Sequence, residues 1–362
     1  MRKRSPAALL LASAIVLAAC GSSGGAKTAS SSSSEDVRGQ TVTMVTHDSF
    51  AVSDAVLQAF EQRTGINVEI ARGGDAGQVV TQAILTKGSP IGDVLFGVDN
   101  TLLGRALDAG IFEPYASPSL SALDPALDLD KDQHRVTPID ESDVCVNYDK
   151  RQFGAVGKPP VPATLDDLTK ADYKNQLVVQ NPATSSTGLA FLLATVKRYG
   201  EDRYLDYWKK LRDNGVLVTD GWEQAYNEQF SAGGSGIGTR SLVVSYATSP
   251  PADVVYATPA KSDTDVAVLL DGCYRQIEFA GVLAGTKHPA AARQVIDFLV
   301  SEELQADIPL NMFVYPARIG TPLPEEFTKY AAKPTSTLAI DPQEVASKRD
   351  KWIKDWTAAV IG

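Results

Sequence analysis

Six short segments of the sequence combine carboxylate, hydroxyl and aromatic side chains, which are groups that hold small molecules in place. They are residues 46–50 (THDSF), 97–100 (GVDN), 181–188 (NPATSSTG), 221–226 (GWEQAY), 245–250 (SYATSP) and 311–316 (NMFVYP). Most of them follow a predicted strand or begin a predicted helix. Because ligands of α/β sheets bind at the carboxyl ends of the strands, we expect these segments to form one site.

The aromatic and acidic side chains in these segments suit a flat ligand that carries positive charge. Aromatic faces attract such a ligand by stacking and by the cation–π effect, each worth about 0.5 to 2 kcal/mol, and Tyr246 and Phe313 are the candidates. Asp48 and Asp99 are carboxylates that can pair with an amine or a cationic ring. Trp222 adds an indole N–H donor.

Three hydroxyl side chains, Thr184, Ser185 and Ser186, precede the helix predicted at residues 188–199. Hydroxyls and free backbone N–H groups at a helix N-terminus suit the phosphate or hydroxyl tail of a ligand. A structural role is also open to each candidate, since carboxylates and hydroxyls cap turns and helices and aromatic rings pack in cores. That alternative applies to Asp48, Asp99, Ser185, Ser186, Trp222, Tyr246 and Phe313.

Alternating strand and helix patterns position these segments. Strands are predicted at residues 41–45, 67–71, 93–97, 145–148, 177–180, 242–246 and 274–283. Helices are predicted between Ser53 and Gly65, at 78–85, 101–109, 188–199 and 290–300, and from the N-cap Asp341 through Trp356. The alternation over residues 41–109 implies a parallel sheet covered by helices, and a second α/β unit in the middle of the chain gives two α/β lobes. The glycine-rich residues 233–238 precede a strand, which predicts a flexible loop instead of a nucleotide-binding loop.

The first residues of the chain predict export. A basic start (MRKR) precedes an apolar run at residues 7–17 that is too short to span a bilayer, as is typical of a signal peptide. Residues 17–21 (LAACG) resemble the bacterial lipobox. We therefore expect a signal peptide at 1–19, a lipid on Cys20 and a flexible Gly- and Ser-rich linker over 20–37. An incidental cysteine in a plain signal peptide is the alternative.

Charge and histidine usage argue against several functions. The net charge of −10 makes nucleic acid or anionic lipid a poor partner, since both require basic patches. His47, His134 and His288 lack metal-ligand spacing, so we expect no metal and no cofactor. An enzyme is not favoured, because the candidate serines lack a G-x-S-x-G elbow and no Cys–His pair is recognisable.

Taken in order, the segments resemble the thiamine-binding proteins of bacterial ABC importers, within the family of two-lobed periplasmic binding proteins. The resemblance rests on D-S-F at 48–50, G-x-D-N at 97–100, P-x-T-S-x-x-G at 182–188, G-W-x-x-A-Y at 221–226, S-Y-x-T-S-P at 245–250 and Y-P at 315–316. Two positions depart from the family pattern. His47 replaces a usual tyrosine, which weakens the case for a phosphate contact there, and Phe313 replaces a usual tryptophan, which weakens stacking.

The resemblance implies an α/β fold of the two-lobed periplasmic-binding-protein type, with a ligand cleft between the lobes. Lobe one would hold residues 38–140 plus 276–312, and lobe two would hold 141–275 plus 313–362. The implied ligand is thiamine, thiamine phosphate or thiamine diphosphate, captured by a lipid-anchored monomer on the outer face of the cytoplasmic membrane and delivered to ABC permease subunits. The ligand-binding residues would be His47, Asp48, Ser49, Asp99, Asn100, Thr184, Ser185, Ser186, Trp222, Tyr226, Tyr246, Ser249, Phe313 and Tyr315. The same fold binding another solute, such as ferric iron or a polyamine, is the alternative.

Two cysteines, Cys145 and Cys273, remain after Cys20. Both lie in strands that we expect to pass between the lobes. Crossing strands lie side by side, so the two Cβ atoms can approach the roughly 3.5 to 4.5 Å that a disulfide needs. An oxidising compartment permits the bond. Two buried free thiols are the alternative.

Overall fold

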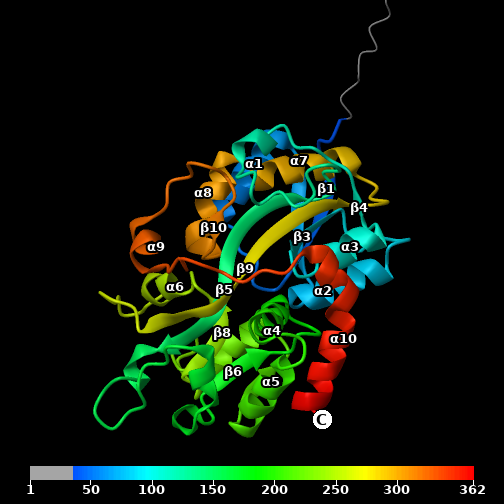
Figure 1. The fold of residues 1–362 in the computed structure, drawn as a ribbon. Coiled ribbons are helices and arrows are strands. Elements are labelled where there is room, and N and C mark those ends of the chain that lie inside the picture. Colours follow the sequence, from blue (N-terminus) through cyan, green and yellow to red (C-terminus); the bar gives the residue numbers. More distant parts are fainter. Residues whose placement is uncertain (1–35) are drawn as a thin grey trace, which may run out of the picture. The chain divides into compact units, whose positions relative to one another are not determined.

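Ten strands form one mixed β-sheet within residues 36–362, which are the residues that the computed structural model describes (Figure 1). The strand order is β2-β1-β3-β9-β5-β8-β6-β7, with β4 added beside β9 and β10 beside β5. The strands are β1 (Thr41–Thr46), β2 (Asn67–Arg72), β3 (Val94–Asp99), β4 (Phe112–Glu113), β5 (Thr137–Asp149), β6 (Leu177–Gln180), β7 (Leu217–Thr219), β8 (Leu242–Tyr246), β9 (Val266–Leu283) and β10 (Tyr315–Pro316). Cys20 and the expected signal peptide lie outside the described residues.

Helices alternate with the strands, and their ends follow local signals. Gly65 ends α1 in the left-handed conformation, with a φ of 74°. The Asp341 side chain caps α10 by accepting hydrogen bonds from the backbone N–H groups of Gln343 and Glu344. The α-helices are α1 (Asp54–Thr64), α2 (Ala76–Leu85), α3 (Leu103–Ala109), α4 (Ser186–Tyr199), α5 (Tyr204–Asp213), α6 (Pro250–Val255), α7 (Pro289–Leu299), α8 (Glu302–Asn311), α9 (Glu325–Tyr330) and α10 (Pro342–Val360). Short 3-10 turns are η1 (Leu120–Ala122), η2 (Lys150–Gln152), η3 (Leu165–Thr169) and η4 (Ala171–Tyr173), and η5 (Gln224–Gln229) is π-helical.

Parallel pairing occurs at the two ends of this sheet. At the β1 end, β1 pairs in parallel with β2 and β3, and at the β6 end, β6 pairs in parallel with β7 and β8. The expected parallel pairing over residues 41–109 is therefore confirmed, whereas in the centre β5 and β9 run antiparallel to their neighbours. The reason is that β5 leads from one α/β unit to the other and β9 returns, so neither belongs to a β-α-β repeat.

Strand β9 is 18 residues long, whereas the sequence pattern predicts a strand only from residue 274. Asp271 and Gly272 are turn-forming residues, and they interrupt the apolar pattern. In the structure Gly272 takes a φ of 79°. The pairing register with β5 shifts nearby, between Val144 and Val146. The strand therefore continues through a bulge that the sequence presents as a break.

A disulfide joins Cys145 of β5 to Cys273 of β9 beside this bulge, with the Cα atoms 4.4 Å apart. Both side chains are buried. This is the pairing that the sequence analysis predicts, and it links the two strands that connect the ends of the sheet.

The C-terminal helix α10 packs against helices from both ends of the sheet, namely α3 and α5, as Figure 1 shows. Trp356 is fully buried, and its ring meets that of Trp208 in α5 edge to face, with the ring centroids 5.4 Å apart. At α3, a Cβ on Gly104 would lie 2.5 Å from the carbonyl oxygen of Pro342, so only glycine permits this approach. Within residues 36–362, the helices are all too short or too polar to cross a membrane.

Candidate functional site

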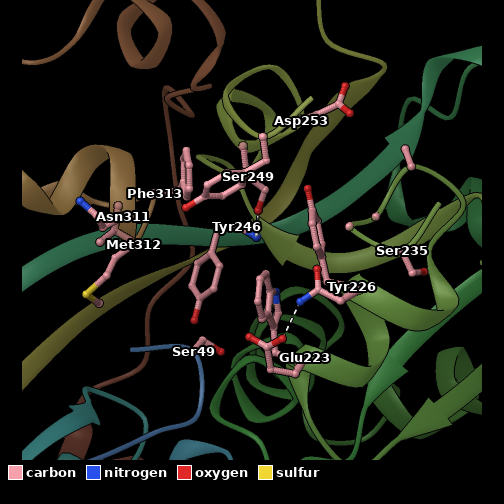
Figure 2. A pocket seen from close by; sticks show the side chains of 18 of the residues that line it. Ser49, Glu223, Tyr226, Ser235, Tyr246, Ser249, Asp253, Asn311, Met312 and Phe313 are labelled. Atoms are coloured by element: carbon pink, nitrogen blue, oxygen red, sulfur yellow. Dashed lines mark hydrogen bonds between the residues drawn. The ribbon is translucent and has the colours of Figure 1, made fainter. Parts of the chain in front are cut away.

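A cavity of about 780 Å³ is lined by residues from both ends of the sheet. Figure 2 shows Asn311 and Met312 on one side of Tyr246, and Ser235 on the opposite side. The lining residues are 47–49 and 75–76 from the β1 end, 278 from β9, 186–187, 222–223, 226–227, 232–236, 246, 249, 252–253 and 256–261 from the β6 end, and 311–314 from the segment that ends α8.

Most of the predicted ligand-binding residues line this cavity. They are His47, Asp48, Ser49, Ser186, Trp222, Tyr226, Tyr246, Ser249 and Phe313. The lining does not include Asp99, Asn100, Thr184, Ser185 or Tyr315. Each of these five makes a contact within the protein that explains its position.

Aromatic rings form one wall of the cavity. The Trp222 ring stacks on Tyr226, with the centroids 4.9 Å apart and an interplanar angle of 14°. Tyr246 lies 6.3 Å from Trp222 with its ring tilted. The indole Nε1–H of Trp222 donates to Ser245 Oγ at 2.9 Å. The indole donor is thus bonded within the protein, and Trp222 contributes to the cavity lining.

Tyr246 stands at the carboxyl end of β8, and Figure 2 shows its ring reaching toward Ser49. Burial raises the pKa of Tyr246 well above its ordinary value, with the Glu278 carboxylate acting in the same direction. The phenol is therefore neutral at physiological pH. Tyr246 offers a ligand both an uncharged aromatic face and a hydroxyl group.

Phe313 holds a backbone conformation that bulky residues rarely adopt, with a φ of 56°. Its ring packs edge to face against Tyr256, with the centroids 5.4 Å apart. A non-glycine residue in this region carries a strain of about 1 to 3 kcal/mol, which the surrounding packing must offset. Such strained residues gather at ligand sites, and Phe313 lies in the cavity wall.

Asp75 connects the two ends of the sheet and was not predicted from the sequence. Its Oδ1 accepts from the Ser186 backbone N–H and its Oδ2 from the Trp222 backbone N–H, both at 3.0 Å. Burial raises the pKa of Asp75, while these two bonds act in the opposite direction. An aspartate directly before a helix is expected to cap that helix, but the side chain makes no such bond to α2. It caps α4 instead.

The hydroxyl groups before α4 are mostly used by the protein itself. Ser185 Oγ accepts from the Gly188 backbone N–H at 3.4 Å and so caps α4. Thr184 Oγ1 donates to the Asp220 carbonyl at 2.6 Å. Ser185 thus caps α4 and Thr184 ties the loop before it to the Asp220 carbonyl, and neither residue lines the cavity. Ser186 lines the cavity, with its N–H bonded to Asp75.

Asp99 and Asn100 fix the turn after β3 and do not reach the cavity. Asp99 Oδ1 accepts from the backbone N–H and the hydroxyl of Thr101, at 3.0 and 2.6 Å. Its Oδ2 accepts from Gln276 Nε2 at 2.9 Å. Asn100 Oδ1 accepts from the Ile277 backbone N–H at 2.9 Å. Asp99 therefore caps the turn that leads into α3, which is the structural alternative, and it does not line the cavity.

Tyr315 is held in β10, away from the cavity. Residues Tyr315–Pro316 pair with β5, and the Tyr315 ring meets Phe327 edge to face with the centroids 5.0 Å apart. The Lys333 ammonium lies 4.9 Å from the centre of the same ring. These contacts occupy the ring, so Tyr315 acts in packing and not in the cavity wall.

The cavity lining is acidic. Its carboxylates are Asp48, Asp75, Glu223, Asp253 and Glu278. Lys261 also lines it, but its ammonium pairs with Asp253 at 2.7 Å and with Asp265 at 2.8 Å. Glu278 was not predicted from the sequence, although a charged residue within the apolar strand of residues 274–283 could have drawn attention to it. The lining therefore favours a ligand with positive charge.

The glycine-rich loop also belongs to the cavity. Residues 233–236 line it, whereas the sequence predicts only a flexible loop there. A Cβ on Gly233 would lie 1.7 Å from the Tyr226 carbonyl oxygen, so glycine allows the loop to fold tightly onto η5. Residues 256–261, which follow α6 in the sequence, also line the cavity.

Known proteins share the sequence features of this chain. Residues 89–346 match the family described as bacterial extracellular solute-binding protein. The chain is similar to the thiamine-binding periplasmic protein of Escherichia coli strain K12. The two are 32% identical over 323 residues, which cover 88% of this chain and 93% of that protein.

Solved structures share the fold. A periplasmic thiamin binding protein matches with a TM-score of 0.77 and 29% identity, over 89% of this chain and 98% of that chain. Iron-bound HitA from Pseudomonas aeruginosa matches with a TM-score of 0.69 and 22% identity, over 88% of this chain and 99% of that chain, which shows the fold alone. The predicted α/β fold of the two-lobed binding-protein type is thereby confirmed. The relatives are extracytoplasmic solute-binding proteins and not enzymes, and this chain belongs to the bacterial extracellular solute-binding protein family.

Proposed function

We propose that this chain captures thiamine or one of its phosphate esters outside the cytoplasm and delivers it to an ABC importer. The observation that carries the proposal is a cavity of about 780 Å³ that combines aromatic faces with an acidic lining. Thiamine joins a flat aminopyrimidine to a flat, positively charged thiazolium ring. Aromatic faces and carboxylates are the groups that attract both rings. The volume lies within the roughly 300 to 1,000 Å³ typical of small-molecule sites.

The proposed ligand position lies between Tyr246 and Phe313. Both rings line the cavity from different parts of the chain, one at the end of β8 and the other after α8. We propose that His47, Asp48, Ser49, Ser186, Trp222, Tyr226 and Ser249 complete the contacts. Of the three hydroxyl residues before α4, only Ser186 lines the cavity, so fewer groups are available to bind a phosphate than the sequence suggested.

The proposal includes two lobes that close on the ligand. Lobe one is 38–140 plus 276–312, and lobe two is 141–275 plus 313–362. The order of the sheet supports it, because the β1 end and the β6 end are joined through β5 and β9 and both contribute to the cavity. Closure would be a hinge motion. Small-angle scattering with saturating thiamine should show a smaller radius of gyration than the unliganded protein.

We further propose that the mature chain is a monomer held at the outer face of the cytoplasmic membrane by a lipid on Cys20. The support is the lipobox-like sequence LAACG and the Gly- and Ser-rich segment that follows it. Mass spectrometry of protein extracted from membranes should find diacylglycerol on Cys20. A Cys20→Ala variant recovered in the membrane fraction would contradict the anchor.

Calorimetric titration with thiamine, thiamine phosphate, ferric citrate and spermidine tests the ligand. We expect thiamine or its phosphate to bind and to raise the melting temperature, because a ligand that binds only the folded state stabilises it. Ferric citrate and spermidine should show no binding heat and should leave the melting temperature unchanged. Binding of ferric citrate in place of thiamine would overturn the proposal. Within residues 36–362, no three His, Cys, Asp or Glu side chains gather as a metal site.

A further inference from the structure

Three buried carboxylates lie side by side across the centre of the sheet. Glu278 of β9 pairs in register with Asp99 of β3 on one side and with Asp140 of β5 on the other. Asp99, Asp140 and Glu278 are 0%, 1% and 6% exposed. Of the three, Glu278 lines the cavity. Burial and the neighbouring Glu278 raise the pKa values of Asp99 and Asp140, so a positive charge that reaches Glu278 is favoured beside this row.

His47 holds the position beside Glu278. Its Nε2 lies 3.5 Å from Glu278 Oε1. The ring rests on the backbone of Gly97, where a Cβ would lie 2.5 Å from the His47 Cδ2, and it is 5.6 Å from the Phe96 ring. These contacts support the imidazole on one side in the position beside the carboxylate. His47 lines the cavity together with Glu278.

The charged groups around His47 favour its protonated form. Burial acts to lower its pKa, but the carboxylates of Glu278, Asp75 and Asp48 outweigh burial and raise the pKa of His47 above its ordinary value. These three carboxylates lie on β9, in the loop before α2 and beside His47 itself. Lys261 is a further cation in the lining and is paired with Asp253, which Figure 2 shows well separated from Ser49.

On the basis of the proposed thiamine function, we infer that Glu278 selects the positive charge of the ligand and that His47 releases its proton when that charge arrives. Before binding, the imidazolium of His47 balances Glu278. After binding, the thiazolium balances Glu278, His47 is neutral, and the proton passes to solvent. The charge of the pocket is unchanged overall, and no bond to the ligand forms or breaks.

The inference predicts pH-dependent capture. A ligand that displaces one proton binds more weakly as the pH falls below the His47 pKa of the free protein, by up to about tenfold per pH unit. The affinity levels off at higher pH, where His47 is already neutral. Asp99, Asp140 and Tyr246 also face Glu278. Asp99 and Asp140 have raised pKa values and would also release protons when a positive charge arrives. The Tyr246 phenol stays neutral and would not titrate in this range.

Isothermal titration with thiamine at pH 6.5, in buffers of different ionisation heat, measures the protons released. We expect a net proton release for the wild type that falls by more than half in His47→Gln. His288→Gln is the matched control, because His288 precedes α7 and does not line the cavity. Thiamine binding without proton release in the wild type would refute the inference, whereas no binding at all would refute the proposed function.

A second pair of variants tests the role of Glu278. The comparison ligand is a neutral deaza analogue, in which a thiophene ring replaces the thiazolium. We expect the wild type to prefer thiamine over this analogue and Glu278→Gln to lose about ten- to hundredfold of that preference. Glu69→Gln, on the exposed face of β2, should keep it. If folded wild type and folded Glu278→Gln prefer thiamine over the analogue equally, Glu278 does not recognise the charge of the ligand.

Discussion

Replacing Asp99 by asparagine should stabilise the protein at neutral pH. Asp99 is fully buried, and burial, together with the nearby Glu278 charge, raises its pKa to about 7. Asparagine keeps the oxygen that accepts from Thr101. Its amide can donate to Gln276 after that side chain turns over, since Gln276 Oε1 has no partner in the structure. The variant therefore removes the buried charge while the turn after β3 stays intact.

The magnitude follows from the pKa values of the folded and unfolded states. A carboxyl with a pKa raised from 3.8 to about 7 binds its proton more tightly in the folded protein. Its stabilising contribution is full below the unfolded value and is lost as the pH rises through the folded value. The difference corresponds to about 4 kcal/mol between roughly pH 4 and pH 8, and Asp99 is buried enough for solvent to screen little of it.

Urea denaturation of the wild type and Asp99→Asn at several pH values, with the disulfide intact, provides the test. The difference in unfolding free energy should shift in favour of the variant by about 3 to 4 kcal/mol between roughly pH 4 and pH 8. Other groups titrate in both proteins and largely cancel in the difference. A difference that is the same at every pH would refute the reasoning, since it would mean that Asp99 is ionised in the fold at all of them.

Three further predictions concern the cavity, α4 and the disulfide. Tyr246→Ala should weaken thiamine binding by about 1 to 3 kcal/mol through lost stacking, and calorimetry showing an unchanged Kd in a folded variant would remove Tyr246 from the site. Ser185→Ala should lower stability by about 1 kcal/mol in thermal melts, because it removes a helix cap, while the ratio of thiamine to thiamine phosphate affinities stays constant. Denatured, unreduced protein should show no free thiol from Cys145 or Cys273, and a Cys145→Ser, Cys273→Ser double variant should lose about 3 to 5 kcal/mol of stability, since the loop closed is long.

Local patterns were sufficient for the elements that carry the cavity. The apolar run of β8 and the change to polar residues after Tyr246 mark a strand that ends at a site, and the structure has β8 over Leu242–Tyr246. Gly65 and Asp341 mark helix ends by chemistry that acts within a few residues. These predictions hold because backbone conformation at such positions depends on neighbours in the sequence.

Long-range contacts decided what the sequence could not show. Asp75 looks like the cap of the helix that follows it, but its carboxylate reaches the start of α4, more than 100 residues later. Asp99 and Ser185 follow strands or begin helices as ligand-binding residues do, yet hydrogen bonds within the protein occupy them. Glu278 lies in the middle of a strand, and only the pairing of β9 with β3 and β5 shows that it faces other carboxylates. Spacing along the chain cannot distinguish a group that faces a ligand from one that faces its own backbone.

The central position of β9 also sets the order in which the chain can fold. β9 lies between β3 and β5, although about 170 residues separate it from β3 in the sequence. Until residue 283 has left the ribosome, the edge of β3 that pairs with β9 has no partner, and the β1 end of the sheet remains incomplete. Such non-local pairing slows folding, because loop-closure entropy must be overcome before the contacts form. A chain whose sheet is completed only late in synthesis stays unfolded for longer. An unfolded chain is the form that can be translocated across a membrane.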